Sequence, residues 1–247
     1  MNIFNRVFDS NNHTSSFAIN LVNHCSHCCG LARTGWSGNH YQAVILSCKI
    51  RNNGRQAELF NGKNLDGWEY RGFGPEKPTF NVENGTIVGR TLIPRSTGAF
   101  LCTKEQFKDF ELLFEVKIDE GLNSGVQVRS TPSGTMRGPQ VEIESGSHKT
   151  GFIFGQGGLG WVSEDLTEKN TTYNAGEWNA FRVLVVGNNI KTWVNGNPLA
   201  DLTSDKIAPE GVIALQVHGY PRGSKREQGA DKVLSVAWRN IKIKEIP

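Results

Sequence analysis

The strongest constraint on the fold is a two-residue alternation of apolar and polar side chains. In Phe110–Ile118 every even-numbered residue is apolar, whereas Glu111, Glu115 and Lys117 lie between them. Successive side chains of a β-strand point to opposite faces, so this pattern predicts a strand with one buried face. Asn195-Gly196 predicts a tight hairpin turn, because both residues tolerate a positive φ. Similar short runs predict further strands at 85–89, 124–130, 140–144, 151–155, 178–186, 190–194, 211–218 and 233–243.

About ten short strands with little helical periodicity predict an all-β sandwich or barrel. No internal repeat is visible in the sequence, which argues against a propeller. No run approaches the roughly 18 apolar residues of a membrane-spanning helix. We therefore predict one β-sandwich domain over residues 55–247 and no membrane partner.

Residues 1–54 form a different kind of sequence. They lack sustained periodicity and contain four of the five cysteines and four of the six histidines. We predict a disordered tail or a mis-assigned start, without a clear signal peptide. The run from His24 to Cys29 resembles zinc-ligand spacing but has no second Cys pair, so no metal site is predicted. In the body, Cys102 follows apolar residues and is predicted to be a buried thiol.

The excess of positive charge also lies in the first segment. Residues 1–54 carry a net charge of +3, so the remainder of the chain is neutral. A protein that binds nucleic acid needs a basic stripe against the phosphate backbone, and none is present in the body. The composition therefore disfavours nucleic acid as a partner.

Three predicted strands carry long polar side chains on the face opposite their apolar residues. In 140–144, for example, Val141 and Ile143 point into the core, so the three residues around them point outward. The polar residues assigned in this way are Gln127 and Arg129, then Gln140, Glu142 and Glu144, then Gln216 and His218. Such residues commonly belong to an ordinary solvated sheet. If the strands are neighbours, they form a groove with candidate bases, acids and hydrogen-bond donors for a sugar.

Two further features of this face bear on chemistry. Glu142 and Glu144 are two residues apart on one strand, about 6–7 Å. At that distance like-charge repulsion raises the pKa of one carboxyl. Sugar sites also use aromatic platforms, and the candidates in this sequence are Trp161, Trp193 and Tyr220.

The sequence resembles the 3-keto-disaccharide hydrolase domain family over about residues 58–246. The motifs that carry the resemblance occur in the same order along the chain. They are Leu59-Phe-Asn-Gly-Lys-Asn-Leu-Asp-Gly-Trp68, Asn123-Ser-Gly-Val-Gln-Val-Arg129, Gly138-Pro-Gln-Val-Glu-Ile-Glu144, Thr150-Gly-Phe-Ile-Phe-Gly155, Gly176-Glu-Trp-Asn179, Trp193-Val-Asn-Gly196, Leu215-Gln-Val-His-Gly219 and Arg239-Asn-Ile-Lys-Ile243.

The resemblance implies a concanavalin-A-like jelly-roll sandwich of two antiparallel sheets, often secreted or periplasmic. It implies cleavage of glycosides already oxidised at C3, by C2 proton abstraction, elimination and water addition on the concave face. One departure is that many members carry Glu-x-Gln where this chain has Gln140-x-Glu142. The donor and acceptor positions are therefore exchanged.

These observations give a set of expected roles. Glu142 or His218 would act as base or acid, and Arg129 would hold the enolate oxygen. Gln140 and Glu144 would orient the sugar or bind a divalent cation, and no other cofactor is expected. The remaining substrate contacts would come from Gln127, Gln216, Asn123, Trp161, Trp193 and Tyr220.

Two other functions stay open on the sequence. The same fold serves lectins, so a non-catalytic carbohydrate-binding module is one alternative. An ordinary glycoside hydrolase that uses a carboxylate pair is the other. The sugar, its linkage and the oligomeric state do not follow from the sequence.

Overall fold

The computed structural model describes residues 55–72, 78–92, 97–145, 149–158, 160–161, 163, 172–219 and 232–247. The predictions for residues 1–54, including the His24–Cys29 run, lie outside these residues. Tyr220 also lies outside them, and only the backbone of Trp161 is described. Within the described ranges no helix is long and apolar enough to cross a membrane.

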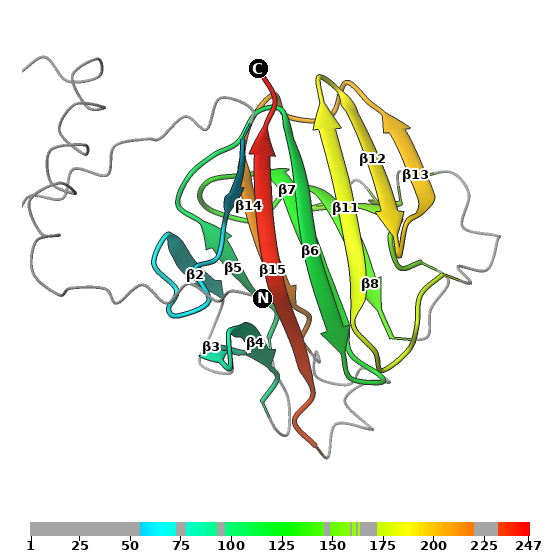
Figure 1. Cartoon of the computed structure of the whole chain (residues 1–247). Coiled ribbons are helices and arrows are strands. Elements are labelled where there is room, and N and C mark those ends of the chain that lie inside the picture. Colours follow the sequence, from blue (N-terminus) through cyan, green and yellow to red (C-terminus); the bar gives the residue numbers. More distant parts are fainter. Residues whose placement is uncertain are drawn as a thin grey trace, which may run out of the picture. The chain divides into compact units, whose positions relative to one another are not determined.

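The described residues form two antiparallel sheets that pack face to face, as predicted (Figure 1). Sheet A has the order β13-β12-β11-β6-β15-β4-β3, and β1 pairs with β15. Its strands are β1 (Gln56–Glu58), β3 (Thr79–Glu83), β4 (Thr86–Arg90), β6 (Phe110–Ile118), β11 (Asn179–Val186), β12 (Asn189–Val194), β13 (Asn197–Thr203) and β15 (Ser235–Glu245).

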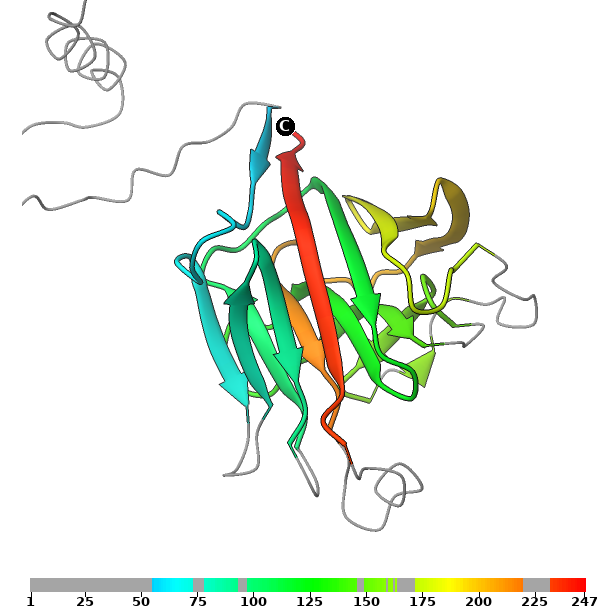
Figure 2. The same ribbon diagram turned by 60° about the horizontal axis from the view of Figure 1, so that its bottom comes forward.

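Sheet B has the order β10-β9-β8-β7-β14-β5-β2 and lies behind sheet A in Figure 1. The turned view in Figure 2 shows the same two layers, with β14 behind β15. The strands of sheet B are β2 (Trp68–Gly72), β5 (Ala99–Thr103), β7 (Asn123–Ser130), β8 (Gly138–Glu144), β9 (Ile153–Gln156), β10 (Gly160–Trp161) and β14 (Val212–Val217). There are more strands than predicted. The strands β1 and β10 have too few residues to show an alternation, and the longer β2, β3, β5 and β13 were also missed.

The core lies between the sheets and follows the predicted period. In β6 the residues Leu112, Phe114 and Val116 are buried, while the residues between them are only partly covered or exposed. Phe114 stacks on Phe181 of β11 with 4.9 Å between ring centroids. The predicted Asn195-Gly196 turn joins β12 to β13, with positive φ at both residues.

Sheet B differs from sheet A in that its central strands are buried on both faces. Every residue of β7 and β14 is buried, and so are the middle five residues of β8. The order β8-β7-β14 makes the three strands with polar outer residues neighbours, which is the condition under which the sequence predicted a groove. We call the face of sheet B that points away from the core the pocket face.

Candidate functional site

The polar side chains of the pocket face form rows across β8, β7 and β14. The first row is Glu144, Asn123 and His218, because Asn123 pairs with Glu144 and its carbonyl accepts from the His218 N–H at 3.2 Å. The second row is Glu142, Gly125 and Gln216. The antiparallel pairing of β8, β7 and β14 therefore places residues that are far apart in the sequence side by side on one surface.

A continuous chain of hydrogen bonds links these rows. The Asn123 amide nitrogen donates to both carboxylates, to Glu142 Oε1 and to Glu144 Oε1 at 3.0 Å. The Gln140 Nε2 donates to Glu142 Oε2 at 2.9 Å, and Gln127 Nε2 donates to Gln140 Oε1 at 2.5 Å. Both oxygens of Glu142 are therefore fixed by amides, which orients its carboxyl group.

Glu142 is the most perturbed acid of this site. Its side chain is only 4% exposed, and burial raises its pKa to about 7. The hydrogen bonds from Asn123 and Gln140 lower the pKa in part, and repulsion from Glu144 raises it further. The sequence predicted a raised pKa from like-charge repulsion, but burial is the larger cause in the structure.

A pocket of about 190 Å³ opens on these residues. This is smaller than the roughly 300 Å³ at which pockets for drug-sized ligands begin, so it suits one small ring. Two of its lining residues were missed from the sequence, Phe154 and Gln156 of β9. Because Ile153 is in the core, the two-residue period would have placed both on the pocket face. The pocket is lined by Asn123, Gln140, Glu142, Glu144, Phe154, Gln156, Gln216 and His218.

Gly125 forms the floor between Glu142 and Gln216. A Cβ atom at this position would lie 2.5 Å from the Cγ, Cδ and Nε2 atoms of Gln140. A side chain here would displace Gln140 and with it one of the two amides that hold Glu142. The absence of a side chain at Gly125 therefore leaves the space that Gln140 occupies.

His218 and Gln216 complete the pocket from β14. The His218 Nδ1 lies 2.7 Å from the carbonyl oxygen of Gly219, so Nδ1 carries the proton in the neutral ring. Its Nε2 is then the nitrogen that can accept a proton. Among the described residues no group bonds Oε1 of Gln216, although that atom is buried. A buried acceptor without a partner is costly.

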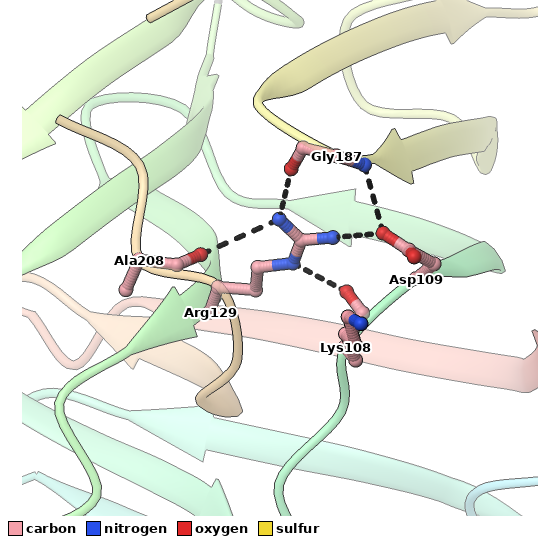
Figure 3. A network of polar contacts seen from close by, with 5 residues as sticks. All are labelled: Lys108, Asp109, Arg129, Gly187 and Ala208. Atoms are coloured by element: carbon pink, nitrogen blue, oxygen red, sulfur yellow. Dashed lines mark hydrogen bonds and ion pairs between the residues drawn. The ribbon is translucent and has the colours of Figure 1, made fainter. Parts of the chain in front are cut away.

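Arg129 does not join these residues, and the prediction that it shares a face with Gln127 is wrong. Its side chain is 1% exposed and donates to Asp109 Oδ1 at 2.6 Å. It also donates to three backbone carbonyls, as Figure 3 shows, namely those of Lys108, Gly187 and Ala208. Arg129 thereby ties β7 to three loops and points away from the pocket.

The reason for this reversal is a bulge in β7. Gln127 pairs with Ala214 and Ser130 with Val212, so two residues of β7 lie opposite Ile213 alone. Arg129 has a φ of +46° at this bulge, which shifts the alternation by one position. Ser130 therefore returns to the side of Gln127 and donates to its Oε1 at 2.8 Å.

The other sequence-predicted contacts divide into three groups. Gln127 is fully buried beside Gln140 and supports it without lining the pocket. Trp193 belongs to β12 of sheet A, so it lies on the other side of the molecule from the pocket. The side chain of Trp161 and the whole of Tyr220 lie outside the described residues.

The donor set of the site does not form a metal centre among the described residues. In the described part of the chain, no group of three or more His, Cys, Asp or Glu side chains is placed to hold a metal ion. Glu142 and Glu144 already accept hydrogen bonds from Asn123. We therefore assign no step to a metal. Cys102 is buried as predicted, and burial raises its thiol pKa to about 11.

Comparison with solved structures finds the same fold in proteins of low sequence identity. A Parabacteroides distasonis protein provisionally named a glycosyl hydrolase is 21% identical, with a TM-score of 0.54 over 78% of this chain and 94% of that one. The carbohydrate-binding module CBM66 of Bacillus subtilis is 15% identical, with a TM-score of 0.51 over 72% and 96%. A Bacillus subtilis protein of unknown function with a galectin-like fold is 8% identical, with a TM-score of 0.50 over 77% and 94%.

Sequence comparison gives the family. A search of curated proteins finds no match. The family model of the 3-keto-alpha-glucoside-1,2-lyase-like domain, however, matches residues 56–244. This range contains every strand of the sandwich except the last residue of β15 and includes the whole pocket. The chain therefore belongs to the 3-keto-alpha-glucoside-1,2-lyase-like domain family, a family of carbohydrate-active domains.

Proposed function

We propose that this domain cleaves the glycosidic bond of 3-keto-glycosides by elimination and water addition, with Glu142 as the base. The observation that carries the proposal is the buried Glu142 carboxyl, held by two amides in a polar pocket, with a pKa of about 7. A general base is most effective when its pKa is near the working pH. The C2 proton next to a C3 ketone suits such a base, because its removal gives an enolate.

The reaction has three balanced steps. Glu142 takes the C2 proton, and the C–H electron pair forms the enolate with its charge on the C3 oxygen. The ketone then re-forms, a C1–C2 double bond forms, and the C1–O bond breaks while the leaving oxygen takes a proton. Water finally adds its hydroxyl to C1 and a proton to C2. The net result is hydrolysis of the bond.

His218 is the proposed proton carrier at the leaving oxygen. Because its Nδ1 faces the Gly219 carbonyl, its Nε2 is the nitrogen that exchanges protons with a ligand. The C3 oxygen needs hydrogen-bond donors as charge develops. Since Arg129 points away, we assign this role to the amides of Gln156 and Gln216, which line the pocket.

The arrangement of the carboxyls favours this route over an ordinary glycoside hydrolase. A retaining hydrolase uses two carboxyls on either side of the bond, about 5–5.5 Å apart. Here Glu142 and Glu144 lie on one strand and bind the same nitrogen of Asn123. They therefore belong to one wall of the pocket. A purely binding module has no need of a carboxyl whose pKa is near 7, and this favours catalysis over a lectin role.

The decisive experiment is cleavage of p-nitrophenyl 3-keto-glucoside in D₂O, with its unoxidised parent as the matched substrate. Elimination and addition place deuterium on C2 of the released sugar, whereas direct displacement leaves the C2 hydrogen in place. A reaction without enzyme measures spontaneous exchange, and an arm with chelator tests for a cation requirement.

Three results would contradict the proposal. Cleavage of only the unoxidised parent would assign an ordinary hydrolase. Cleavage of the keto substrate without deuterium at C2 would exclude proton abstraction there. Tight binding of the keto sugar with no product would assign a carbohydrate-binding module.

A further inference from the structure

The outer face of sheet A has a groove of about 600 Å³, roughly three times the volume of the catalytic pocket. The residues that shape this outer groove are Glu115, Ala180, Arg182, Trp193, Asn240 and Lys242. The hydrophobic core lies between the outer groove and the pocket, because the alternate residues Phe114 and Phe181 of the same strands point inward. The two sites are therefore independent surfaces of one domain.

The floor of the outer groove is a small residue that lies beside a bulky stack. Ala180 of β11 is exposed and forms the floor. On one side Arg182 lies over Trp193, with 4.1 Å from the guanidinium carbon to the ring centroid. Beyond the other end of the floor, Arg239 lies over Trp178 at the same distance. The Arg182–Trp193 stack lines the groove, together with Asn240 and Lys242 of β15, whereas Trp178 and Arg239 lie outside its lining.

Both stacks are held in place before any ligand binds. Arg182 pairs with Glu111 at 2.6 Å, and Arg239 pairs with Glu115 at 2.7 Å. The amide of Asn240 also donates to Glu115 at 2.9 Å. Groups that are already ordered lose little conformational entropy on binding, so this surface is suited to a ligand with weak individual contacts.

The charges of the outer groove indicate a neutral ligand. Each cation around it has a carboxylate partner, since Lys242 also pairs with Glu58 at 3.2 Å. A polyanion would find no unbalanced positive charge among these residues. The groove instead offers the ring of Trp193 for apolar C–H groups and charged side chains for hydroxyls. Both requirements are met by the rings of an uncharged sugar chain.

We propose that the outer groove is a second carbohydrate-binding surface, which holds a neutral glycan chain while the pocket on the opposite sheet acts on a single ring. This surface would keep the domain on a polymeric material and raise the local concentration of chain ends. It does not depend on the role of Glu142, because an inactive domain would still bind through sheet A.

Native affinity electrophoresis of the full chain in gels with dextran, a soluble β-1,3-glucan or galactomannan tests this proposal, with alginate as the anionic comparison. All variants are made in a Glu142→Gln background, so turnover does not alter the gel. Ala180→Trp fills the outer groove without removing a contact, and Trp193→Ala removes one stack. Val186→Trp is the matched control, since Val186 is exposed on the same strand outside the groove.

We expect at least one neutral polysaccharide to retard Glu142→Gln. Ala180→Trp should weaken that binding by about tenfold or more, and Val186→Trp should leave it unchanged. Thermal unfolding and light scattering of each variant check folding and oligomeric state. Retardation by alginate alone, no retardation by any neutral polysaccharide, or equal retardation of Ala180→Trp would overturn the proposal. So would a dimer in Glu142→Gln that Ala180→Trp dissociates, because the groove would then hold a second copy.

The outcome is separable from that of the catalytic proposal. Binding of polysaccharide by a domain that leaves 3-keto-glucosides intact would refute the proposed function alone. Turnover without polysaccharide binding would refute the outer groove alone.

Discussion

The pocket face of sheet B and the outer face of sheet A both carry glutamates on strands with the same two-residue period. On the pocket face Glu142 is 4% exposed and held by two neutral amides. On sheet A Glu115 is partly exposed and held by Arg239. Burial raises the pKa of Glu142 to about 7, whereas the Arg239 and Asn240 hydrogen bonds lower that of Glu115 despite its partial burial. Burial among neutral amides raises the pKa of a carboxyl and makes it a candidate base. A carboxyl that pairs with an arginine has a lowered pKa and stays an anion with a structural role.

The largest effect that tests this comparison is expected from Glu142→Gln. Turnover of a 3-keto-glucoside should fall by about 10²–10⁴-fold, the usual contribution of a general base. The variant keeps the size of the side chain but turns one acceptor oxygen into a donor beside Asn123 or Gln140, so it should stay folded with the loss of one hydrogen bond. Steady-state kinetics measure turnover, and thermal unfolding checks the fold.

The matched control is Glu115→Gln on the outer face. It should leave turnover within about twofold, because partly exposed pairs contribute about 1 kcal/mol or less. If the two substitutions lower turnover equally, the distinction drawn between the two faces is wrong.

A second comparison concerns two arginine pairs with the same N–O distance of 2.6 Å, Arg129–Asp109 and Arg182–Glu111. Arg129→Met should lower the free energy of unfolding by about 3–5 kcal/mol, because Asp109 and the loop carbonyls lose a buried partner. Arg182→Met should cost about 1 kcal/mol or less, since that side chain is 41% exposed. Urea denaturation measures the difference.

Activity decides whether Arg129 has a further role. If Arg129 only ties the loops together, the Arg129→Met protein that remains folded at low temperature should keep its turnover number. Loss of turnover in a folded variant, with no change in stability, would restore the enolate role that the sequence suggested.

The third effect is a pH dependence specific to the pocket face. The pKa of Glu142 is raised from 4.5 to about 7 on folding, so the native state holds this proton more tightly than the unfolded chain does. The stabilisation is complete below pH 4.5 and is lost as the pH rises towards 7. At about 1.4 kcal/mol per pKa unit, the loss amounts to roughly 3 kcal/mol.

Denaturation of wild type and Glu142→Gln between pH 4 and 8 measures this term. The free energy of unfolding of Glu142→Gln, minus that of the wild type, should increase as the pH rises and level off above pH 7. Turnover by the wild type should rise over the same range as Glu142 ionises. A difference that is constant with pH would mean that the Glu142 pKa is not raised in the native protein.

The smallest expected effect comes from Gly125→Ala. The added Cβ meets Gln140 at 2.5 Å, so Gln140 must move and release one amide from Glu142. Overpacking of this kind costs about 1–3 kcal/mol. Calorimetry of Gly125→Ala, Gln140→Ala and the double variant forms a mutant cycle. The double variant should regain part of the stability lost in Gly125→Ala, and strictly additive losses would exclude the steric coupling.

The amino-acid sequence alone was enough to predict which face of a regular strand each side chain occupies. The alternation along 140–144 placed Gln140, Glu142 and Glu144 together, and the structure has them on the pocket face. The same rule applied to β9 would also have found Phe154 and Gln156. The assignment of side chains to faces succeeds because the direction of a side chain in a regular strand follows from local backbone geometry.

Where each face lies in the molecule, and how deeply it is buried, depends on contacts between strands that are distant in the sequence. Trp193 lies in sheet A because its strand, β12, pairs there with β11 and β13. The sequence of β12 alone does not show this pairing. Arg129 leaves the groove because β7 bulges against β14, and a bulge is defined only by the register with a partner strand. The raised pKa of Glu142 likewise depends on burial by neighbouring strands. Local backbone geometry fixes the face of the strand to which a side chain points. Pairing with distant strands fixes where that face lies and how buried it is, and burial in turn fixes the pKa values of its acids.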